Sequence, residues 1–381
     1  MSRPTAGHFF YMSLRVINII QLFEDWAPKW VAWEKDNVGL QVGDKQNKVT
    51  KVLITLDVTK QIVNEAIDQK AELIVSHHPL LFRPPSAIIA NDPVGELVLR
   101  LAEHKIALFS AHTNLDFTQG GVNFALAEIL GLKNIRFLAP LKNSLAKIVV
   151  FVPEGHVERV IYAMTQAGAG IIGKYSSCSF GTKGTGSFYG STASNPFLGK
   201  RGNLEFVEET RLEMIAPRAI MPDVTAAMKA VHPYEEPAYD IYFIENPNPN
   251  FGMGALGKLR KPQSLAFFLK FLKRTLGIGA LRYTGSLTRK IQNIAVCGGA
   301  GSELLSDAIA AKADVFVTAD VRYHTFQKAN ETIALIDAGH WETEQIILKP
   351  IAARLRSAAN AAHEPLTVFI TKHKTNPIKI I

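Results

Sequence analysis

The stretch AELIVSHHP, at residues 71–79, decides the fold class of this chain. A short apolar run between turn signals is typical of a strand buried on both faces, and the proline ends its hydrogen-bonding ladder. The two adjacent histidines therefore lie where the strand ends. Short β-rich runs alternate with amphipathic segments on both sides of this stretch. This alternation predicts an α/β fold of mostly parallel strands joined by helices.

The alternation occurs twice, once near each end of the chain. The run at 71–76 aligns with ADVFVT at 313–318, and in each half the third strand is followed by a histidine four residues before an acid. We interpret this as a weak internal duplication that gives two similar α/β lobes facing one cleft. The expected elements are strands at 52–56, 73–75, 106–109, 294–297, 315–318 and 332–336, and helices at 59–70, 94–104, 302–311 and 323–329.

A different pattern separates the two halves. Its expected order is strand, helix, a Gly/Ser/Thr-rich hairpin region, strand, helix and strand, which is the βαββαβ order of a ferredoxin-like α+β domain. Prolines and glycines from Pro247 to Gly254 mark the exit linker. The expected domains are 1–145 for the first lobe, 146–248 for the insertion and 249–381 for the second lobe.

Bulk composition limits the classes of protein. The 381 residues are 47% hydrophobic and 20% charged, which is close to the globular average and argues against long disorder. No apolar run approaches the roughly 20 residues of a membrane span. With Cys178 and Cys297 far apart, we expect a reducing, cytoplasmic compartment and a metal held by His and carboxylate.

The start of the chain and the net charge give weaker evidence, about targeting and about binding partners respectively. Residues 1–12 lack a clean apolar core and a cleavage site, so we expect no signal peptide and a domain that starts near Met12. Ser13 is the expected N-cap of a first helix with an apolar stripe from Leu14 to Phe23. The net charge of +8 is scattered, so we expect a solvated surface with a weak attraction for anions.

Three chain positions place metal-ligand residues just after predicted parallel strands. His77 and His78 end one strand, where both imidazoles can reach a single cleft, each towards a different ion; a pair of capping histidines is the alternative. Asp116 follows another strand. His340 and Glu344 share one face of a helical turn, and a carboxylate such as Glu344 can bridge two cations. For His340 and Glu344 alone, a chance ion pair is the alternative. The placement of all three positions after predicted parallel strands favours a metal site.

Further polar residues are expected around the same cleft. His112 is expected to support the site by orienting Asp116; the alternatives are a proton carrier near the substrate or a residue that only satisfies a local hydrogen bond. His324 is a second candidate proton carrier. Asp320 is expected in the substrate pocket, with a supporting or capping role as its alternative. The glycine turn at 298–301 could bind a phosphate on its N–H groups, but it lacks a P-loop lysine, so a tight structural turn is the preferred interpretation.

A series of motifs resembles one known family along nearly the whole chain. The motifs are DNVGLQVG at 36–43, LDVT at 56–59, SHHP at 76–79, HTNLD at 112–116, CGGAGS at 297–302 and GH at 339–340 with Glu344. In this order they resemble the Nif-three-like family, whose members are also described as GTP cyclohydrolase I type 2 homologues. The motif HPYEEP at 232–237 is similar to that of the PII-like or CutA-like domain inserted in the longer bacterial members.

The resemblance implies a dinuclear metal centre between two α/β lobes, in a toroidal homohexamer built from trimers. It places the metal ligands on five residues: His77, His78, Asp116, His340 and Glu344. Trp341 stands where some relatives have a smaller or polar residue, which implies a tighter outer face of the cleft.

These observations lead to three functional hypotheses. The first is metal-dependent hydrolysis of a nucleotide-like or phosphorylated small molecule, such as ring opening of GTP, with two divalent ions drawn from Zn, Mn, Fe, Co or Ni. The second is a non-catalytic regulatory or scaffold protein whose inserted domain senses a small ligand. The third, nucleic-acid binding, is least favoured because the basic residues are scattered.

Overall fold

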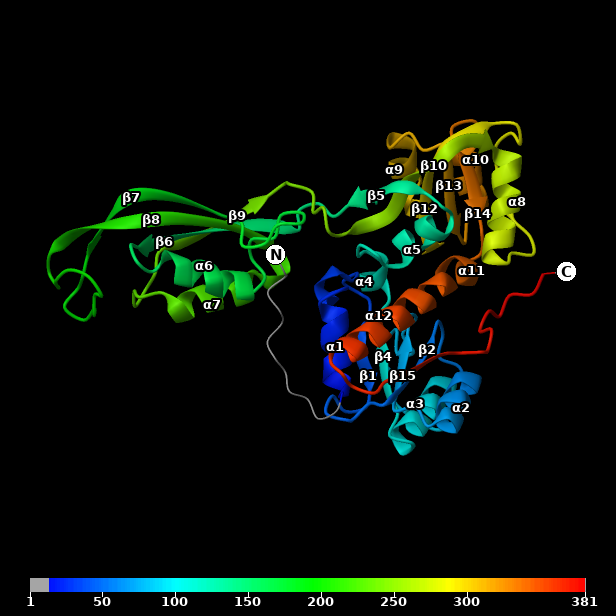
Figure 1. Cartoon of the computed structure of the whole chain (residues 1–381), viewed down its shortest axis with the longest axis horizontal. Helices are drawn as coiled ribbons and strands as arrows, with labels where there is room; N and C mark the ends of the chain where they lie inside the picture. The colour runs from blue at the N-terminus through cyan, green and yellow to red at the C-terminus, as the bar shows by residue number, and fades with distance from the viewer. Residues whose placement is uncertain (1–13, 381) are drawn as a thin grey trace. The chain divides into compact units, whose positions relative to one another are not determined.

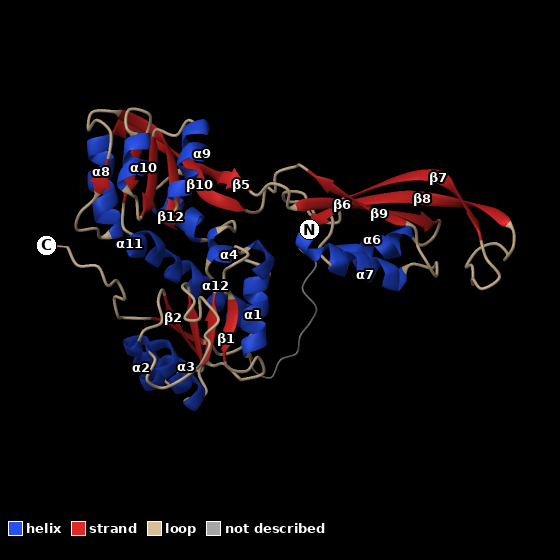
Figure 2. Ribbon diagram, turned by 180° about the vertical axis from the view of Figure 1, so that it is seen from behind, coloured by secondary structure: helices blue, strands red, loops and turns tan. Residues whose placement is uncertain are grey.

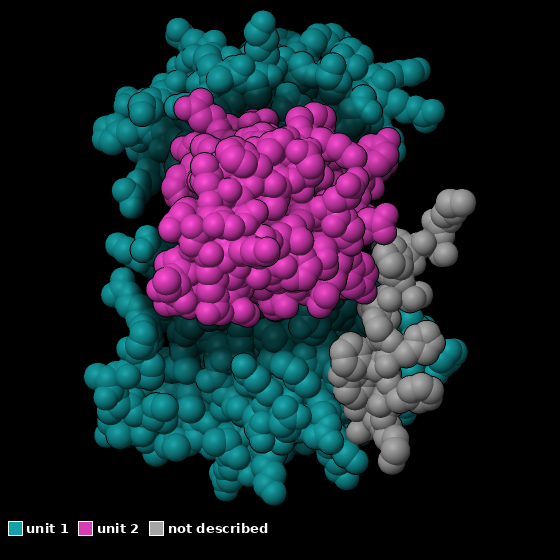
Figure 3. All heavy atoms as spheres, turned by 90° about the vertical axis from the view of Figure 1, so that its left-hand side faces the viewer, with its two compact units in different colours: residues 1–139, 251–381 teal, residues 140–250 magenta. Residues whose placement is uncertain are grey.

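The computed structural model describes residues 14–380, which form two compact units (Figure 3). Unit 1 is Met1–Ala139 with Phe251–Ile381, and unit 2 is Pro140–Asn250. Met12 and Ser13, the predicted domain start and N-cap, lie outside the described residues. Helix α1 begins at Val16. Within the described part of the chain, no helix combines the length and apolarity needed to cross a membrane.

The first sheet of unit 1 has a parallel core with one antiparallel edge. Its strand order is β1-β4-β3-β2-β15, and β1 pairs antiparallel with β4, whereas the other neighbours are parallel. The strands are β1 (Gly39–Val42), β2 (Lys51–Thr55), β3 (Leu73–Ser76), β4 (Ala107–Ser110) and β15 (Thr367–Ile370).

Helices cover both faces of this sheet (Figures 1 and 2). α1 (Val16–Glu24) and α12 (Leu348–Ala361) pack on one face, and α2 (Lys60–Gln69) and α3 (Pro93–Glu103) pack on the other. All four residues of β3 are therefore buried, which explains its continuous apolar sequence.

The second sheet of unit 1 repeats the parallel core. Its order is β11-β14-β13-β12-β10-β5; β12, β13 and β14 are parallel, and β10 and β11 pair antiparallel with β12 and β14. The strands are β5 (Lys133–Pro140), β10 (Gly252–Ser264), β11 (Arg282–Tyr283), β12 (Lys290–Ala300), β13 (Val315–Ala319) and β14 (Ala334–Asp337).

Helices again pack on opposite faces of this sheet. One face of the sheet shares a hydrophobic core with α5 (Val122–Ile129) and α8 (Leu265–Leu276). The opposite face shares a second core with α9 (Leu305–Ala310) and α10 (Tyr323–Ala329). The short helices α4 (Thr113–Asp116) and α11 (His340–Glu344) follow strand ends. Short 3-10 turns occur at Lys29–Val31, Arg218–Ile220, Ser302–Leu304 and Gln345–Ile347.

The two sheets exchange segments in a way that the sequence patterns do not indicate. β15, near the C-terminal end, pairs with β2 in the first sheet, and β5, from the first half, belongs to the second sheet. β1 lies in a segment for which the sequence patterns predict no strand, and β10 begins at Gly252, inside the expected linker. These strands lie at or near sheet edges, where one-sided burial gives a weaker apolar signal.

Unit 2 is a four-stranded antiparallel sheet with two helices on one face. The chain order is β6 (Leu145–Pro153), α6 (Val157–Gln166), β7 (Ser179–Tyr189), β8 (Leu204–Pro217), α7 (Met221–Val231) and β9 (Tyr239–Ile244). The strand order is β7-β8-β6-β9, and both helices share a core with β6 and β8. The first half of β8 has no buried face, so its sequence shows no apolar alternation.

Candidate metal centre

The predicted ligands follow three parallel strands of unit 1. His77 and His78 come directly after β3, Asp116 ends α4 after β4, and His340 and Glu344 bound α11 after β14. Both views of the fold place α4 and α11 between the two sheets (Figures 1 and 2). The carboxyl ends of the two parallel cores therefore supply side chains to one site.

Glu344 lies at the centre of this cluster, with its side chain only 4% exposed. Its Oε2 atom is 2.9 Å from Nε2 of His78 and 3.1 Å from Nε2 of His340. Its Oε1 atom is 4.0 Å from Nε2 of His77, which is itself 3.6 Å from Oδ1 of Asp116. Three imidazoles thus surround one carboxylate whose two oxygens face different histidines, and Asp116 lies beside one of these imidazoles.

The Nδ1 atom of each histidine at the cluster is held by an oxygen. Nδ1 of His77 donates to the carbonyl of Ala111 at 2.8 Å. Nδ1 of His78 lies 2.7 Å from Oδ1 of Asp57, and Nδ1 of His340 lies 2.7 Å from Oδ2 of Asp320. Metal-ligating histidines typically use one ring nitrogen in this way and leave the other for the ion. The arrangement therefore orients the three Nε2 atoms towards the cluster.

Two enclosed atoms at the cluster have no hydrogen-bond partner. They are Nε2 of His77 and Oδ1 of Asp116. Because Nδ1 of His77 donates to a carbonyl, its Nε2 carries a lone pair, and burial lowers the pKa of this imidazole to about 3. A buried lone pair and a buried carboxylate oxygen without donors are costly unless a cation binds them. The residues present therefore fit a metal ion of the kind that accepts imidazole and carboxylate ligands.

Electrostatics within the cluster also favour positive charge. Burial alone would lower the pKa of His78, but hydrogen bonds to Asp57 and Glu344 raise it to about 10. The pKa of His340 likewise rises to about 9 against the effect of burial, through Glu344 and Asp320. Burial would raise the pKa of Glu344, yet the hydrogen bonds from His340 and His78 hold it well below its usual range. Divalent cations bind neutral imidazole and so replace protons at such sites.

A glycine turn gives the carboxylate its space. Gly299 has a φ of +61°, and a Cβ built on it would overlap Oε1 of Glu344 and lie 3.1 Å from Nε2 of His340. The N–H groups of Gly298, Gly299 and Gly301 donate to side-chain oxygens of the protein. These donors are already engaged, so the geometry favours the structural-turn interpretation over a phosphate cradle.

The structure places the other predicted residues at different distances from the cluster. A ring nitrogen of His112 lies within 4.8 Å of ligand atoms of His77 and His78. Asp320 contacts His340 and holds its ring, which corresponds to the supporting alternative for that residue. His324 lies on the exposed face of α10, where its Nδ1 atom is 3.1 Å from Oε1 of Gln327. Of the two candidate proton carriers, His112 therefore lies beside the predicted ligands and His324 does not.

Sequence patterns did not assign two acidic residues that support the cluster. Asp57 holds His78, and Asp36 accepts from His112 Nδ1 at 3.0 Å and from the backbone N–H of Thr113 at 3.1 Å. Asp57 follows the end of β2. A search for acidic residues and histidines just after parallel strands, which identified the ligands, could therefore also have found Asp57. Asp36 lies in an irregular loop, where residue spacing carries no signal.

Fold and site together define an α/β protein in which two parallel-cored sheets converge on a His–carboxylate cluster suited to divalent cations. The chain belongs to the Duf34/NIF3 (NGG1p interacting factor 3) family, whose model matches residues 14–377. A Halalkalibacterium halodurans protein, 41% identical over 95% of this chain and 98% of its own length, is named "GTP cyclohydrolase 1 type 2 homolog". A Bacillus subtilis protein of the same name is 38% identical over 95% of this chain and 98% of its own length.

Solved structures agree with this assignment. A Bacillus cereus protein related to NIF3 is 38% identical and superposes with a TM-score of 0.83, covering 97% of this chain and 100% of its own. A Staphylococcus aureus protein is 29% identical, with a TM-score of 0.79 and coverage of 97% and 100%. The mixed α/β fold with several sheets is therefore that of the NIF3 superfamily.

Proposed function

We propose that this protein is a metal-dependent hydrolase acting on a nucleotide-like or phosphorylated small molecule, with ring opening of GTP as one candidate reaction. The observation that carries the proposal is the enclosed, unpartnered Nε2 atom of His77 beside the carboxylates of Asp116 and Glu344. The name shared by the relatives supports the choice of a nucleotide substrate.

The proposed ligand set holds two divalent ions drawn from Zn, Mn, Fe, Co or Ni. Glu344 is the proposed bridge, because Oε1 is nearest His77 whereas Oε2 contacts His78 and His340. The other ligands are the Nε2 atoms of these histidines and a carboxylate oxygen of Asp116. Oxygen and imidazole ligands without thiolate suit this group of metals.

The side chains around the site have separate proposed roles. Bound divalent ions supply Lewis acidity, which lowers the pKa of water towards neutrality and offsets charge on a phosphoryl or carbonyl oxygen. We assign the proton-carrier role to His112, whose Nδ1 atom faces Asp36 and whose Nε2 atom is left to accept a proton from the attacking water. His324 is less suited, because its Nδ1 atom contacts Gln327 on the same exposed helix.

Metal analysis of matched variants tests this proposal. We expect wild-type protein to contain two ions per chain, Asp116→Ala and Glu344→Ala to lose them with the circular dichroism spectrum intact, and Glu342→Ala to keep them. Glu342 is the matched control because it lies on the same helix but contacts Asn376. Metal-stripped and reloaded proteins are then compared on GTP and other nucleotides. Equal turnover by both forms would refute the metal-dependent reaction.

A second candidate function is a regulatory or scaffold protein in which the metals stabilise structure and unit 2 senses a ligand. The observation in its favour is a cavity of about 710 Å³ in unit 2. Calorimetric ligand binding without product formation would support it over the hydrolase.

We also propose that residues 146–248 are a ferredoxin-like, PII-like or CutA-like domain between lobes 1–145 and 249–381. The βαββαβ element order and the strand order β7-β8-β6-β9 support this assignment. The family resemblance further suggests a cytoplasmic homohexamer built from trimers. Sedimentation analysis tests that assembly, and a monomer at micromolar concentration would contradict it.

A further inference from the structure

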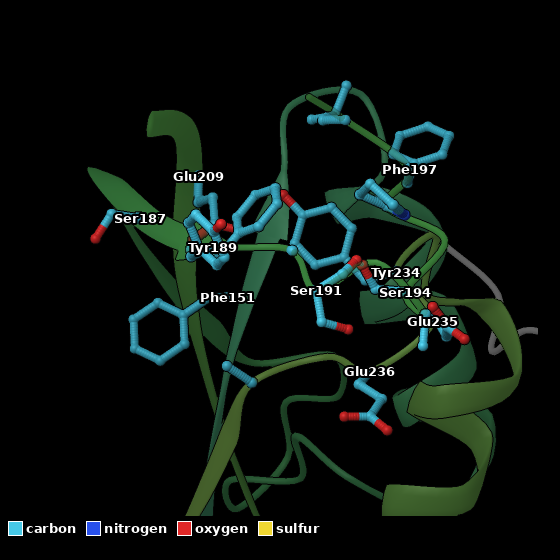
Figure 4. Close-up of a pocket in the computed structure, with 17 residues that line it drawn as sticks. Phe151, Ser187, Tyr189, Ser191, Ser194, Phe197, Glu209, Tyr234, Glu235 and Glu236 are labelled. Atoms are coloured by element: carbon cyan, nitrogen blue, oxygen red, sulfur yellow. Dashed lines mark hydrogen bonds between the residues drawn. The ribbon is translucent and has the colours of Figure 1, made fainter. Parts of the chain in front are cut away.

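The cavity in unit 2 has a chemistry unlike that of the metal centre. It lies among β7, β8, the segment that joins them and the turn between α7 and β9, and its volume of about 710 Å³ is typical of small-molecule sites (Figure 4). Aromatic rings, including Phe151, Phe197 and Tyr234, supply much of its wall. A pocket of this size and composition can enclose a ligand with a sizeable apolar part.

A buried histidine fixes the turn that carries Tyr234. Nε2 of His232 donates to the carbonyl of Phe151 at 3.0 Å, and Nδ1 accepts the backbone N–H of Tyr234 at 3.1 Å. One ring nitrogen therefore donates and the other accepts, which requires a neutral imidazole, and burial lowers the pKa of His232 in agreement. His232 therefore holds this pocket wall in place.

The hydroxyl of Tyr234 is enclosed within this wall, close to the carboxylate of Glu209. Figure 4 shows it pointing to the side of the pocket where Glu209 and Tyr189 lie. Burial, and then the nearby Glu209, raises the pKa of Tyr234, so the hydroxyl stays protonated and its oxygen can accept a hydrogen bond from a ligand.

Among the described residues, the charged side chains that line the cavity are all acidic. Glu209, Glu235 and Glu236 are among the lining residues, which include no Lys, Arg or His. The carboxylate of Glu209 lies over the backbone of Gly186, where any side chain would overlap it. The nearby Arg201 is directed to the carbonyl of Thr192 at 3.4 Å. The pocket therefore presents acidic side chains beside aromatic faces, with no basic side chain among its lining residues.

We propose that this cavity binds an organic cation, an ammonium or guanidinium group carried on an apolar stem. Aromatic faces attract cations through their quadrupole, and carboxylates add charge-assisted hydrogen bonds. Among the described residues, groups of three ligand atoms within 4.8 Å of one another occur at the metal centre and not among these glutamates. That spacing favours a cation larger than a bare metal ion.

Isothermal titration of the full-length protein tests this proposal with three probes of similar shape. We expect phenethylammonium to bind with saturation, and neutral phenethyl alcohol and anionic phenylpropionate to bind at least about 10-fold more weakly, because a buried charged hydrogen bond is lost. Equal affinity for the three probes would overturn the proposal. So would displacement of phenethylammonium by millimolar calcium or magnesium, which would assign the carboxylates to a metal ion.

Matched variants locate the binding. Glu209→Gln should weaken phenethylammonium at least about 10-fold, and Tyr234→Phe several-fold, because both keep the shape of the pocket. Glu208→Gln should bind as wild type does, since successive side chains of β8 face opposite sides of the sheet and Glu208 contacts Thr185. Glu344→Ala should also bind normally, which separates this site from amine coordination at the metal centre. Equal losses in Glu208→Gln or Glu344→Ala would refute the assignment.

Discussion

Gly299→Ala provides a sharp test of the metal centre, because the change adds one methyl group beside the central carboxylate. A Cβ at this position overlaps Oε1 of Glu344 and lies 3.0 Å from its Cδ atom. No ligand is deleted and no charge is changed. The variant therefore asks whether metal binding depends on where Glu344 lies and not only on its presence.

The expected magnitude follows from the overlap. To restore ordinary van der Waals separation, the Glu344 oxygen has to move by about 1 Å, whereas metal–ligand distances tolerate about 0.2 Å. We therefore expect the affinity for at least one ion to fall about 100-fold or more, beyond the range seen when a supporting residue is lost. The φ of +61° adds a backbone cost of about 1 kcal/mol for alanine.

Gly277→Ala is the matched control. Gly277 has a φ of +67° at the C-terminal end of α8, and its Cβ would meet nothing within 4 Å. Both variants therefore carry the same backbone cost, and only one displaces Glu344. Metal affinity is measured by competition with a fluorescent chelator, and unfolding by urea titration of the metal-free proteins.

Without metal, Gly299→Ala should lose at least as much stability as Gly277→Ala, because it also displaces Glu344, and only Gly299→Ala should lose metal affinity. If Gly299→Ala binds two ions as tightly as Gly277→Ala, then Glu344 is not a ligand in the position described here. That result would refute the bridging role directly.

Two other substitutions test the residues that hold the histidines. Asp57→Asn should lower metal affinity about 10- to 100-fold, because His78 loses its charged partner; an unchanged affinity in the chelator assay would contradict this role. Asp36→Asn should reduce the free energy of unfolding at pH 7 by about 2 kcal/mol, because hydrogen bonds from His112 and Thr113 overcome the effect of burial and lower the pKa of Asp36 to about 2. The depressed pKa means that this contribution is present above about pH 4 and is lost as the pH falls towards 2. Urea titrations of the wild-type and Asp36→Asn proteins should therefore converge over that interval, and a constant difference would argue against the hydrogen bonds assigned to Asp36.

The parallel core of each lobe could be predicted from sequence, because a strand buried on both faces has a continuous run of apolar residues. β3 and β13 are buried along their whole length, and their apolar runs are continuous. β1 and β15 are edge strands of four residues, with intermediate or exposed positions and no such pattern. Their pairing depends on partners far away in the chain, which local periodicity does not contain.

The candidate ligands could be proposed for a related reason. Strand ends are visible in sequence, and the carboxyl ends of parallel strands share one edge of a sheet. His77 and His78 were therefore expected near Asp116. The meeting with His340 and Glu344 needs the second lobe to face the first, which rested on the internal similarity and the family resemblance. The supporting contacts of Asp36 and Asp57 were not assigned.

The sequence by itself determined the α/β class and the residue types that suit a divalent cation. These properties depend on local burial and side-chain chemistry, which the order of residues contains. Only the tertiary structure decided which ring nitrogen each histidine presents, that Glu344 lies between three imidazoles, and that Gly299 leaves room for it. The contact between His78 and Glu344, for example, joins residues more than 200 positions apart, and no local pattern encodes it.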